Sequence, residues 1–238
     1  MADPARTVVI VPARGGSKRL PRKNVLPLGG KPLILHGVDV ALAAAPFGRV
    51  MVSTDDPEIR QIALGREGVT VDDRASALAG DKIKIVDVVG EFLDRPDIHQ
   101  SFDAIGVLLP TCPFRTPDQV AEGCAALTTD YDAAIAFSTY EFSPQSSVTF
   151  DAGGTMIPLF DPSPLRTGNT RSQDQAPAYR PTGAFFFTWI ASFRRLRSFY
   201  TGRVKGVITP RINGVDIDDA LDFEYAQFLI DRGHIKVP

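Results

Sequence analysis

The fold follows from one stretch near the N-terminus, Thr7-Val8-Val9-Ile10-Val11-Pro12-Ala13-Arg14-Gly15-Gly16-Ser17-Lys18-Arg19. Thr7–Val11 is a continuous run of β-branched residues that stops at Pro12, which is typical of a strand covered on both faces. The sequence then changes at once to glycines and cations. Because ligands of open α/β sheets bind beyond the carboxyl ends of strands, this stretch predicts a first strand followed by a binding loop.

The same alternation continues along the first half of the chain. Further strands are expected at Arg49–Ser53, Ala104–Leu109 and Ala133–Phe137. Helices are expected at Leu33–Ala45, Pro57–Leu64, Ile83–Leu93 and Pro117–Leu127. Two of these helices begin with a proline that follows Asp or Thr, which is a favourable helix start. Strand–helix alternation of this kind predicts a Rossmann-like, doubly wound and mainly parallel α/β sheet.

The pattern changes after about residue 140. Glu141–Arg180 is rich in Pro, Ser, Gly, Asp and Gln, and a structureless loop of that length is unusual in a compact domain. We therefore expect a single domain over residues 1–238, with a protruding insertion at about 140–180 that serves function or an oligomer contact. Regular structure is expected again at Ala184–Trp189, at Val204–Thr209 and in a last helix, Ala220–Asp231.

The composition is that of an ordinary globular protein. The 238 residues carry a net charge of −2, with 44% apolar and 23% charged residues, which excludes collagen, coiled coil and wholesale disorder. Near-neutral charge argues against a nucleic-acid partner. The two cysteines form no CxxC or Cys/His cluster, which argues against structural zinc. No signal peptide or membrane-spanning run is recognisable, so we expect a cytoplasmic protein without a membrane partner.

The loop after the first strand concentrates positive charge. Its five cations within ten residues are Arg14, Lys18, Arg19, Arg22 and Lys23. Gly15 and Gly16 would let backbone N–H groups approach an anion closely. The loop fits neither a Walker A motif nor GxGxxG. One interpretation is therefore a polyphosphate site, and the other is a solvated basic turn.

This loop begins a series of motifs that resembles the acylneuraminate cytidylyltransferases, also called CMP-sialic acid synthetases. Pro12–Asn24 and Pro27–Leu33 resemble the nucleotide signature of that family. Weaker matches follow in order at Val52–Asp55, Leu109–Arg115, Arg171–Asp174, Tyr179–Ala184 and Val215–Asp218. The resemblance covers nearly the whole chain. It implies the nucleotide-diphospho-sugar transferase type of fold, and a homodimer built with the protruding segment.

The resemblance also implies an activity. The family transfers CMP from CTP to the anomeric hydroxyl of a nine-carbon 2-keto acid sugar and releases pyrophosphate. By resemblance, the residues that bind CTP are Arg14, Gly15, Ser17, Lys23 and Asn24. Arg14 and Lys23 would contact the phosphates, where fixed cations and Mg²⁺ stabilise the charge that builds on the leaving pyrophosphate. Lys23 is the first choice for a catalytic residue, followed by Arg14.

A second candidate site is Asp216-Ile217-Asp218. In extended chain, residues i and i+2 face the same side, and two carboxylates on one face suit Mg²⁺. Capping of the last helix by Asp218 or Asp219 is an equally good local interpretation. The resemblance favours metal binding for Asp216 and Asp218, with a catalytic part for Asp216 in activating the sugar hydroxyl, and leaves capping to Asp219.

A third candidate site lies between Arg171 and Phe187. Arg171 and Gln173 are suited to hold the carboxylate or hydroxyls of an acidic sugar. Tyr179 and Phe185 would line its acyl-group pocket. Ordinary core packing is the alternative for the run Phe185–Phe187.

Two positions depart from the family pattern. Leu109 stands where the family usually has a sugar-contacting Gln, which leaves the identity of the sugar open. After Arg74, which is itself expected to contact CTP, the usual hydroxyl residues are replaced by Asp81-Lys82-Ile83-Lys84-Ile85. Lys82 or Lys84 would then replace hydroxyl contacts with charge. The alternative functions are a cytidylyltransferase for Kdo, another sugar nucleotidyltransferase, or a non-catalytic nucleotide-sugar sensor.

Overall fold

The centre of the molecule is a seven-stranded sheet in the order β11-β7-β10-β6-β1-β4-β5. The structure is a computed structural model that describes residues 1–80 and 82–236, except for the side chain of Ser172. Asp81, one of the positions that depart from the family pattern, lies outside the described residues. The strands of this sheet are β1 (Thr7–Pro12), β4 (Arg49–Thr54), β5 (Val69–Asp73), β6 (Ala104–Val107), β7 (Ala133–Thr139), β10 (Tyr179–Trp189) and β11 (Val204–Ile208).

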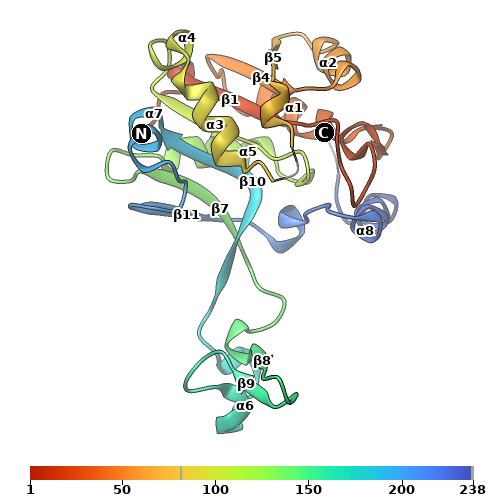
Figure 1. Cartoon of the computed structure of the whole chain (residues 1–238), viewed down its shortest axis with the longest axis vertical. Helices are drawn as coiled ribbons and strands as arrows, with labels where there is room; N and C mark the ends of the chain where they lie inside the picture. Colours follow the sequence, from red (N-terminus) through yellow and green to blue (C-terminus); the bar gives the residue numbers. More distant parts are fainter. Residues whose placement is uncertain (81, 237–238) are drawn as a thin grey trace.

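Parallel pairing dominates the sheet. β1 is parallel to β4 and β6, β4 is parallel to β5, and β11 is parallel to β7. β10 is antiparallel to both of its neighbours, β6 and β7. It reverses because it returns to the body from the end at which β7 leaves it (Figure 1). The predicted doubly wound, mainly parallel sheet is confirmed.

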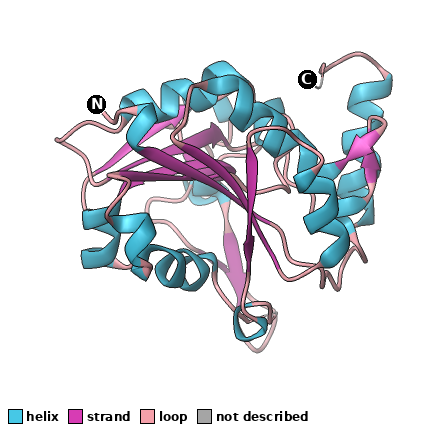
Figure 2. Ribbon diagram, turned by 90° about the horizontal axis from the view of Figure 1, so that it is seen from above, coloured by secondary structure: helices cyan, strands magenta, loops and turns pink. Residues whose placement is uncertain are grey.

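Helices cover both faces of the sheet (Figure 2). The α-helices of the described residues are α1 (Leu33–Ala44), α2 (Pro57–Leu64), α3 (Ile85–Asp94), α4 (Pro96–His99), α5 (Pro117–Ala126), α6 (Pro164–Thr167), α7 (Ile190–Leu196) and α8 (Ala220–Asp231), of which α6 lies away from the sheet (Figure 1). In β1, Val9 and Val11 pack toward α1, α2 and α5, while Val8 and Ile10 pack toward α3, α4 and α7. Burial on both faces explains why this strand is apolar throughout.

The helix starts follow the expected local chemistry. Asp56 caps α2 by accepting from the N–H groups of Glu58 and Ile59, and Thr116 caps α5. Asp219 caps α8 by accepting from the N–H of Asp222 at 3.1 Å. Of the two capping candidates for the last helix, Asp219 is therefore the cap, and the carboxylate of Asp218 is available for other contacts.

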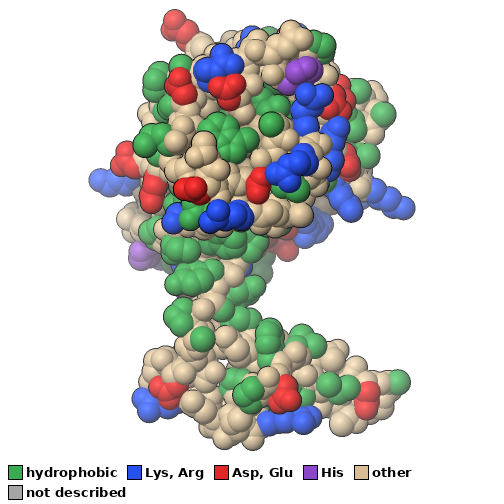
Figure 3. All heavy atoms as spheres, turned by 90° about the vertical axis from the view of Figure 1, so that its left-hand side faces the viewer, with side chains coloured by type: hydrophobic (Ala, Val, Ile, Leu, Met, Phe, Trp, Pro, Cys, Tyr) green, Lys and Arg blue, Asp and Glu red, His purple; other side chains and the backbone are tan. Residues whose placement is uncertain are grey.

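Residues 140–180 form the predicted protruding segment, which we call the arm. β7 and β10 lead into it, and its far end carries α6 and a hairpin of β8 (Val148–Phe150) and β9 (Met156–Pro158) (Figure 1). Apolar side chains gather over its stem (Figure 3). Phe142 is 83% exposed, and Phe150 and Leu159 are 64% and 60% exposed.

Among the described helices, none is long and apolar enough to cross a bilayer.

Candidate functional site

A pocket of about 500 Å³ lies at the edge of the sheet where the parallel strands end. The basic loop, which we define as residues 13–24, forms one wall. The segment after β5, with Arg74 and Leu78, forms another. Leu109 and Thr111, from the connection between β6 and α5, line it together with Asp218. This is the edge at which open α/β sheets bind ligands, so the pocket lies where the sequence predicts a binding loop.

Hydrogen bonds to the end of β4 hold the basic loop in place. The N–H of Ala13 donates to the Ser53 carbonyl at 2.9 Å, and the N–H of Gly15 donates to Asp55 Oδ1 at 3.0 Å. Arg22 pairs with Asp56 and Glu58 at the start of α2. These contacts are why the loop has one shape although it contains neither helix nor strand before Lys23.

Positive charge dominates the pocket. Its charged lining residues are Arg14, Lys18, Arg19, Lys23, Arg74 and Asp218. Among the residues that the structure describes, five cations and one carboxylate therefore line the pocket, in a chain whose net charge is −2. A polyanionic ligand satisfies this arrangement better than water does, because phosphate oxygens accept several charge-assisted hydrogen bonds at once. The structure thus favours a polyphosphate site over a solvated basic turn.

Lys23 is more deeply buried than Arg19 and Arg22, the other two cations of the basic loop whose ion pairs are described here. Its side chain is 11% exposed, and its Nζ donates to the Ile217 carbonyl at 2.6 Å and lies 3.5 Å from Asp218 Oδ1. Arg19 reaches the other carboxylate oxygen of Asp218 at 2.9 Å. The next residue, Asn24, donates from Nδ2 to the Arg14 carbonyl at 3.0 Å. The phosphate-binding candidates and the second candidate site are therefore joined directly.

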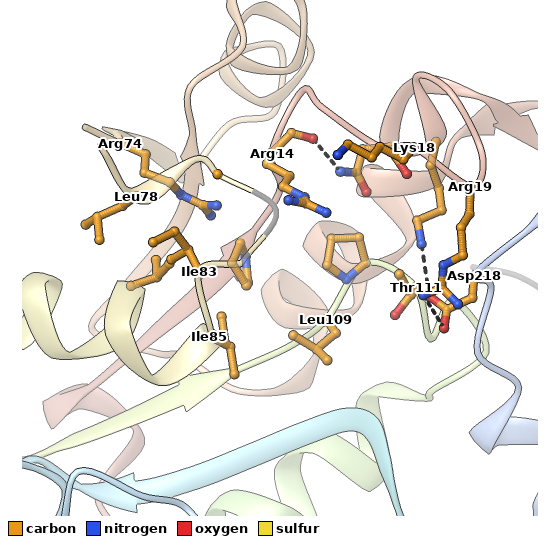
Figure 4. Close-up of a pocket in the computed structure, with 17 residues that line it drawn as sticks. Arg14, Lys18, Arg19, Arg74, Leu78, Ile83, Ile85, Leu109, Thr111 and Asp218 are labelled. Atoms are coloured by element: carbon orange, nitrogen blue, oxygen red, sulfur yellow. Dashed lines mark hydrogen bonds and ion pairs between the residues drawn. The ribbon is translucent and has the colours of Figure 1, made fainter. Parts of the chain in front are cut away.

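Arg74 enters the pocket from the end of β5. Its guanidinium donates to the Ser53 carbonyl at 2.8 Å, and in Figure 4 it points into the same space as that of Arg14. Burial lowers the pKa of Arg74; Asp55 and Asp72 oppose this shift, and Arg14 adds to it. A bound anion would relieve the repulsion between the two arginines.

The pocket has an apolar side as well. Its apolar lining is formed by Leu78, Ile83, Ile85, Val88 and Leu109. In Figure 4 several of these lie beside Arg74, whereas Arg19 and Asp218 lie at the opposite end. A ligand that carries a flat, weakly polar ring at one end and a polyanion at the other fits this division.

The expectation for Lys82 and Lys84 is wrong. Both side chains are exposed, and neither lines the pocket. Ile83 and Ile85 line it in their place, at the turn before α3 and at the first residue of that helix. Lys84 instead precedes α3, where its N–H donates to Asp87 at 3.1 Å.

Gly15 also differs from the expectation. It does not line the pocket, and its N–H is used by Asp55 rather than directed at a ligand. A Cβ at this position would lie 2.4 Å from Asp56 Oδ2. Glycine is required here for close packing against the start of α2, and the structure gives no support to a direct anion contact by its backbone. Ser17 does line the pocket, as expected.

Asp216 and Asp218 flank the fully buried Ile217, so the predicted alternation is present. Asp218 opens into the pocket, whereas Asp216 lines a neighbouring depression. The described residues contain no group of three or more His, Cys, Asp or Glu suited to a metal. Carboxylates are ligands of the kind that Mg²⁺ prefers, and this ion is commonly held by one or two of them with substrate phosphates and water completing its ligands.

The third candidate site is not assembled within one chain. Phe185 is fully buried in the core between the sheet, α1 and α5, so its assignment to a sugar pocket is wrong. The inward face of β10 requires a large apolar side chain there, and a Cβ on Gly123 of α5 would touch its ring. Tyr179 is 45% exposed at the base of the arm. Arg171 and Gln173 are exposed on the arm itself, and none of these residues lines the pocket.

Two arginines near Asp216 were not among the predicted site residues. Arg180 and Arg211 line the neighbouring depression of about 610 Å³, together with Asp216 and Tyr225. Arg180 donates to the Gly214 carbonyl at 3.2 Å. Arg180 could have been found, because it belongs to the motif Tyr179–Ala184. Nothing in the sequence indicates that Arg211 lies near it. Cys112 is fully buried, and burial raises the pKa of its thiol to about 12, so this side chain is poorly suited to act as a nucleophile.

The fold and the pocket have counterparts among known proteins. Residues 8–111 match the family model described as Cytidylyltransferase. The chain is 32% identical over 221 residues to an N-acylneuraminate cytidylyltransferase of Streptococcus agalactiae, which covers 92% of this chain and 52% of that protein. It is 29% identical to a pseudaminic acid cytidylyltransferase of Campylobacter jejuni, covering 96% of this chain and 98% of that protein.

The similarity extends to solved structures. A CMP:2-keto-3-deoxy-manno-octonic acid synthetase complexed with CTP has a TM-score of 0.68 and 20% identity, covering 96% of this chain and 99% of that one. It supports the fold assignment. The chain spans about half the length of the streptococcal relatives that it matches. Over nearly its whole length the chain is thus similar to cytidylyltransferases named for N-acylneuraminate and pseudaminic acid, and residues 8–111 match the cytidylyltransferase model.

Proposed function

We propose that this protein transfers CMP from CTP to the anomeric hydroxyl of a nonulosonic acid and releases pyrophosphate. The observation that carries the proposal is the divided pocket, with an apolar side next to Arg74 and a cationic side around Lys23. Such a pocket matches a pyrimidine ring joined to a triphosphate. Relatives over nearly the whole chain are named for this type of transfer.

The cations of the basic loop have the main part in the proposed reaction. Arg14 and Lys23 bind the phosphates and receive the charge that develops on the departing pyrophosphate. Lys23 now donates to the Ile217 carbonyl and neighbours Asp218, so it is held in a fixed position before the ligand arrives. A preformed donor of this kind needs little reorganisation during the reaction, which is the source of electrostatic catalysis.

Mg²⁺ is part of the proposal. Asp216 and Asp218 would hold it, and when bound it supplies positive charge beside the triphosphate. Asp218 is shared by Lys23 and Arg19 in the absence of a ligand. These cations keep the carboxylate oriented toward the pocket until phosphates compete for them.

The acceptor sugar is proposed to bind on the Asp216 side of the pocket. Arg180 and Arg211 in the neighbouring depression are suited to its carboxylate, since arginine binds carboxylates through two parallel hydrogen bonds. Leu109 offers an apolar contact where a Gln would offer hydrogen bonds, which favours a sugar substituent without a polar group at that point. Arg171, Gln173 and Tyr179 would contribute from the arm of a second copy.

We further propose that the protein is a cytoplasmic homodimer joined through the arm. Exposed Phe142, Phe150 and Leu159 form apolar surface that a lone arm leaves in water, and such patches mark protein contacts. Sedimentation of Phe150→Asp combined with Leu159→Asp tests this. The wild type is expected to sediment as a dimer and the variant as a monomer, whereas a monomeric wild type would contradict the proposal.

The activity is tested by measuring pyrophosphate release. Purified protein is given CTP and Mg²⁺ with a panel of neuraminic, legionaminic and pseudaminic acids, and with Kdo. Release with one nonulosonic acid, abolished by EDTA, is the expected result. Release with Kdo alone would move the assignment to the Kdo enzymes. Tight CTP binding with no release from any acid would favour a nucleotide-sugar sensor.

A further inference from the structure

Arg115 is a fully buried arginine beneath the pocket. It is 1% exposed and lies at the end of the connection between β6 and α5. Among the described residues, no carboxylate forms an ion pair with it. Burial lowers its pKa to about 10, with Cys112 and Asp216 opposing this shift, so it is charged at neutral pH. A buried, unpaired cation is costly, and its presence calls for a structural or functional reason.

The contacts of Arg115 indicate that reason. Its Nε donates to the Cys112 carbonyl at 2.9 Å, and its Nη2 donates to the carbonyls of Leu109 and Cys112. The guanidinium fork therefore closes the turn that runs from Leu109 to Cys112. Leu109, Pro110 and Thr111 of this turn all line the pocket. Arg115 itself does not line the pocket, so it acts on the site by holding the turn in place.

The same turn holds the second candidate site. The Thr111 carbonyl accepts a 2.8 Å hydrogen bond from the Ile217 N–H, and the Ile217 carbonyl accepts from Lys23. Asn213 adds a further tie by donating from Nδ2 to the Phe114 carbonyl. A continuous series of contacts thus leads from Arg115 through the turn to the backbone between Asp216 and Asp218, and on to Lys23.

We propose that Arg115 is a positioning residue that sets the Leu109–Cys112 turn, and through it the Asp216–Asp218 segment and Lys23, in register for the reaction. This inference rests on the proposed cytidylyltransfer. An apolar side chain would fill the same space but would remove the Arg115 donors from the Cys112 carbonyl and leave the Leu109 carbonyl with the Cys112 N–H alone. The turn and the segment bound to it would then lose their fixed spacing. Small displacements of groups at a reacting centre cost about 10²-fold in rate.

The test compares Arg115→Met and Arg115→Lys with Phe193→Leu. Phe193 is equally buried but belongs to the cluster on the α3 and α7 side, so it controls for lost stability. Hydrogen exchange of residues 215–219, CTP affinity and kcat are measured on each folded protein. For Arg115→Met we expect faster exchange at 215–219 and a kcat lower by about 10²-fold, with CTP affinity little changed. Arg115→Lys keeps the charge without the fork and should lie between Met and wild type.

The outcomes separate this inference from the proposed function. Exchange and kcat equal to those of Phe193→Leu would overturn the positioning role. If the wild type itself releases no pyrophosphate with any acceptor, the proposed function fails, and exchange at 215–219 decides the inference alone: faster exchange than in the control supports it, and equal exchange overturns it. If Arg115→Met does not fold, Arg115→Lys is judged by the same two criteria.

Discussion

The basic loop and the arm are both irregular segments rich in polar residues, yet they are placed in different ways. The loop is tied to β4, α2 and the Asp218 segment by bonds to residues far away in sequence. The bonds of the arm are largely its own, such as Leu159 N–H to the Ser147 carbonyl at 3.0 Å and Gln145 Nε2 to the Ala176 carbonyl at 3.3 Å. The contacts that fix the loop therefore all come from its own chain. Among the described residues, the arm makes few such contacts with the body, and its apolar side chains stay exposed.

This difference separates two kinds of sequence motif. Residues of the basic loop come together in a single chain because strands supply fixed anchors at the edge of the sheet. Residues of the arm, including Arg171 and Gln173, are carried away from the pocket by β7 and β10 (Figure 1). The role of the loop motif can thus be tested on a single chain, whereas the role proposed for the arm motif depends on the proposed dimer.

The largest effect is expected for Lys23→Ala, which removes the cation held between Ile217 and Asp218. We expect kcat for pyrophosphate release to fall by about 10²–10³-fold, since the loss of one preorganised donor at a developing charge has this magnitude. Steady-state kinetics with CTP and Mg²⁺ provide the measurement. Lys205→Ala on β11, outside the pocket, is the control. A near-normal kcat for Lys23→Ala would contradict the proposed part of this lysine in the reaction.

The second prediction concerns the support of the loop. His36 in α1 is fully buried and lies 2.9 Å from the Leu28 carbonyl, in the hairpin of β2 (Pro27–Leu28) and β3 (Lys31–Pro32) that follows the loop. Burial lowers its pKa to about 4. The unfolded chain binds this proton at about pH 6.5. Between these two values the unfolded state holds more protons, so stability is lost as pH falls through this window.

The size of that loss can be measured by urea unfolding at pH 7 and pH 5. The contribution of His36 is expected to be about 2 kcal/mol between these two pH values. His36→Gln cannot titrate there and should lose less stability than the wild type by about that amount. Equal losses in the two proteins would mean that His36 is protonated at the same pH in the folded and unfolded states.

The third prediction tests the arm. Arg171→Ala should raise the KM for the sugar by about tenfold or more, because a charge-assisted hydrogen bond is lost, and should leave the KM for CTP unchanged. Arg166→Ala, also exposed on the arm, is the matched control. A higher KM for CTP would place Arg171 beside the nucleotide, contrary to the separation of loop and arm.

The smallest effect is expected for Lys84→Ala. This lysine is close in sequence to Ile83 and Ile85, which line the pocket, but its own side chain is exposed. An exposed charge outside the pocket is screened by water, so the KM for CTP should change by about twofold at most. A tenfold or larger increase would show that nearness in sequence decides cation contacts here after all.

Local patterns predicted the fold well because the burial of parallel strands on two faces requires continuous apolar runs. The helix starts at Pro57 and Pro117 were equally readable, since their caps are adjacent in sequence. β5 was not predicted, because Val69–Asp73 lies at the edge of the sheet and is only partly buried, so it lacks the continuous apolar run of the central strands. The direction of β10 was not predictable from its apolar residues, which read the same in either orientation.

The candidate site divides in the same way. The motifs pointed to Arg14, Ser17, Lys23, Asn24, Arg74 and Asp218, all of which line the pocket. They misplaced Phe185, because the sequence does not distinguish an apolar residue that lines a ligand pocket from one that packs in the core. They gave no sign that the side chains of Lys82 and Lys84 are exposed while those of Ile83 and Ile85 line the pocket.

The sequence by itself determined the strands, the helix starts, the basic loop and the likeness to the family, because each depends on the chemistry of neighbouring residues. Only the tertiary structure decided that Lys23 meets Asp218, that Arg115 supports the turn above it, and that the arm stands apart. These outcomes depend on contacts between residues up to 195 positions apart. Such contacts are set by how the strands pair and how the helices pack, which no local pattern specifies.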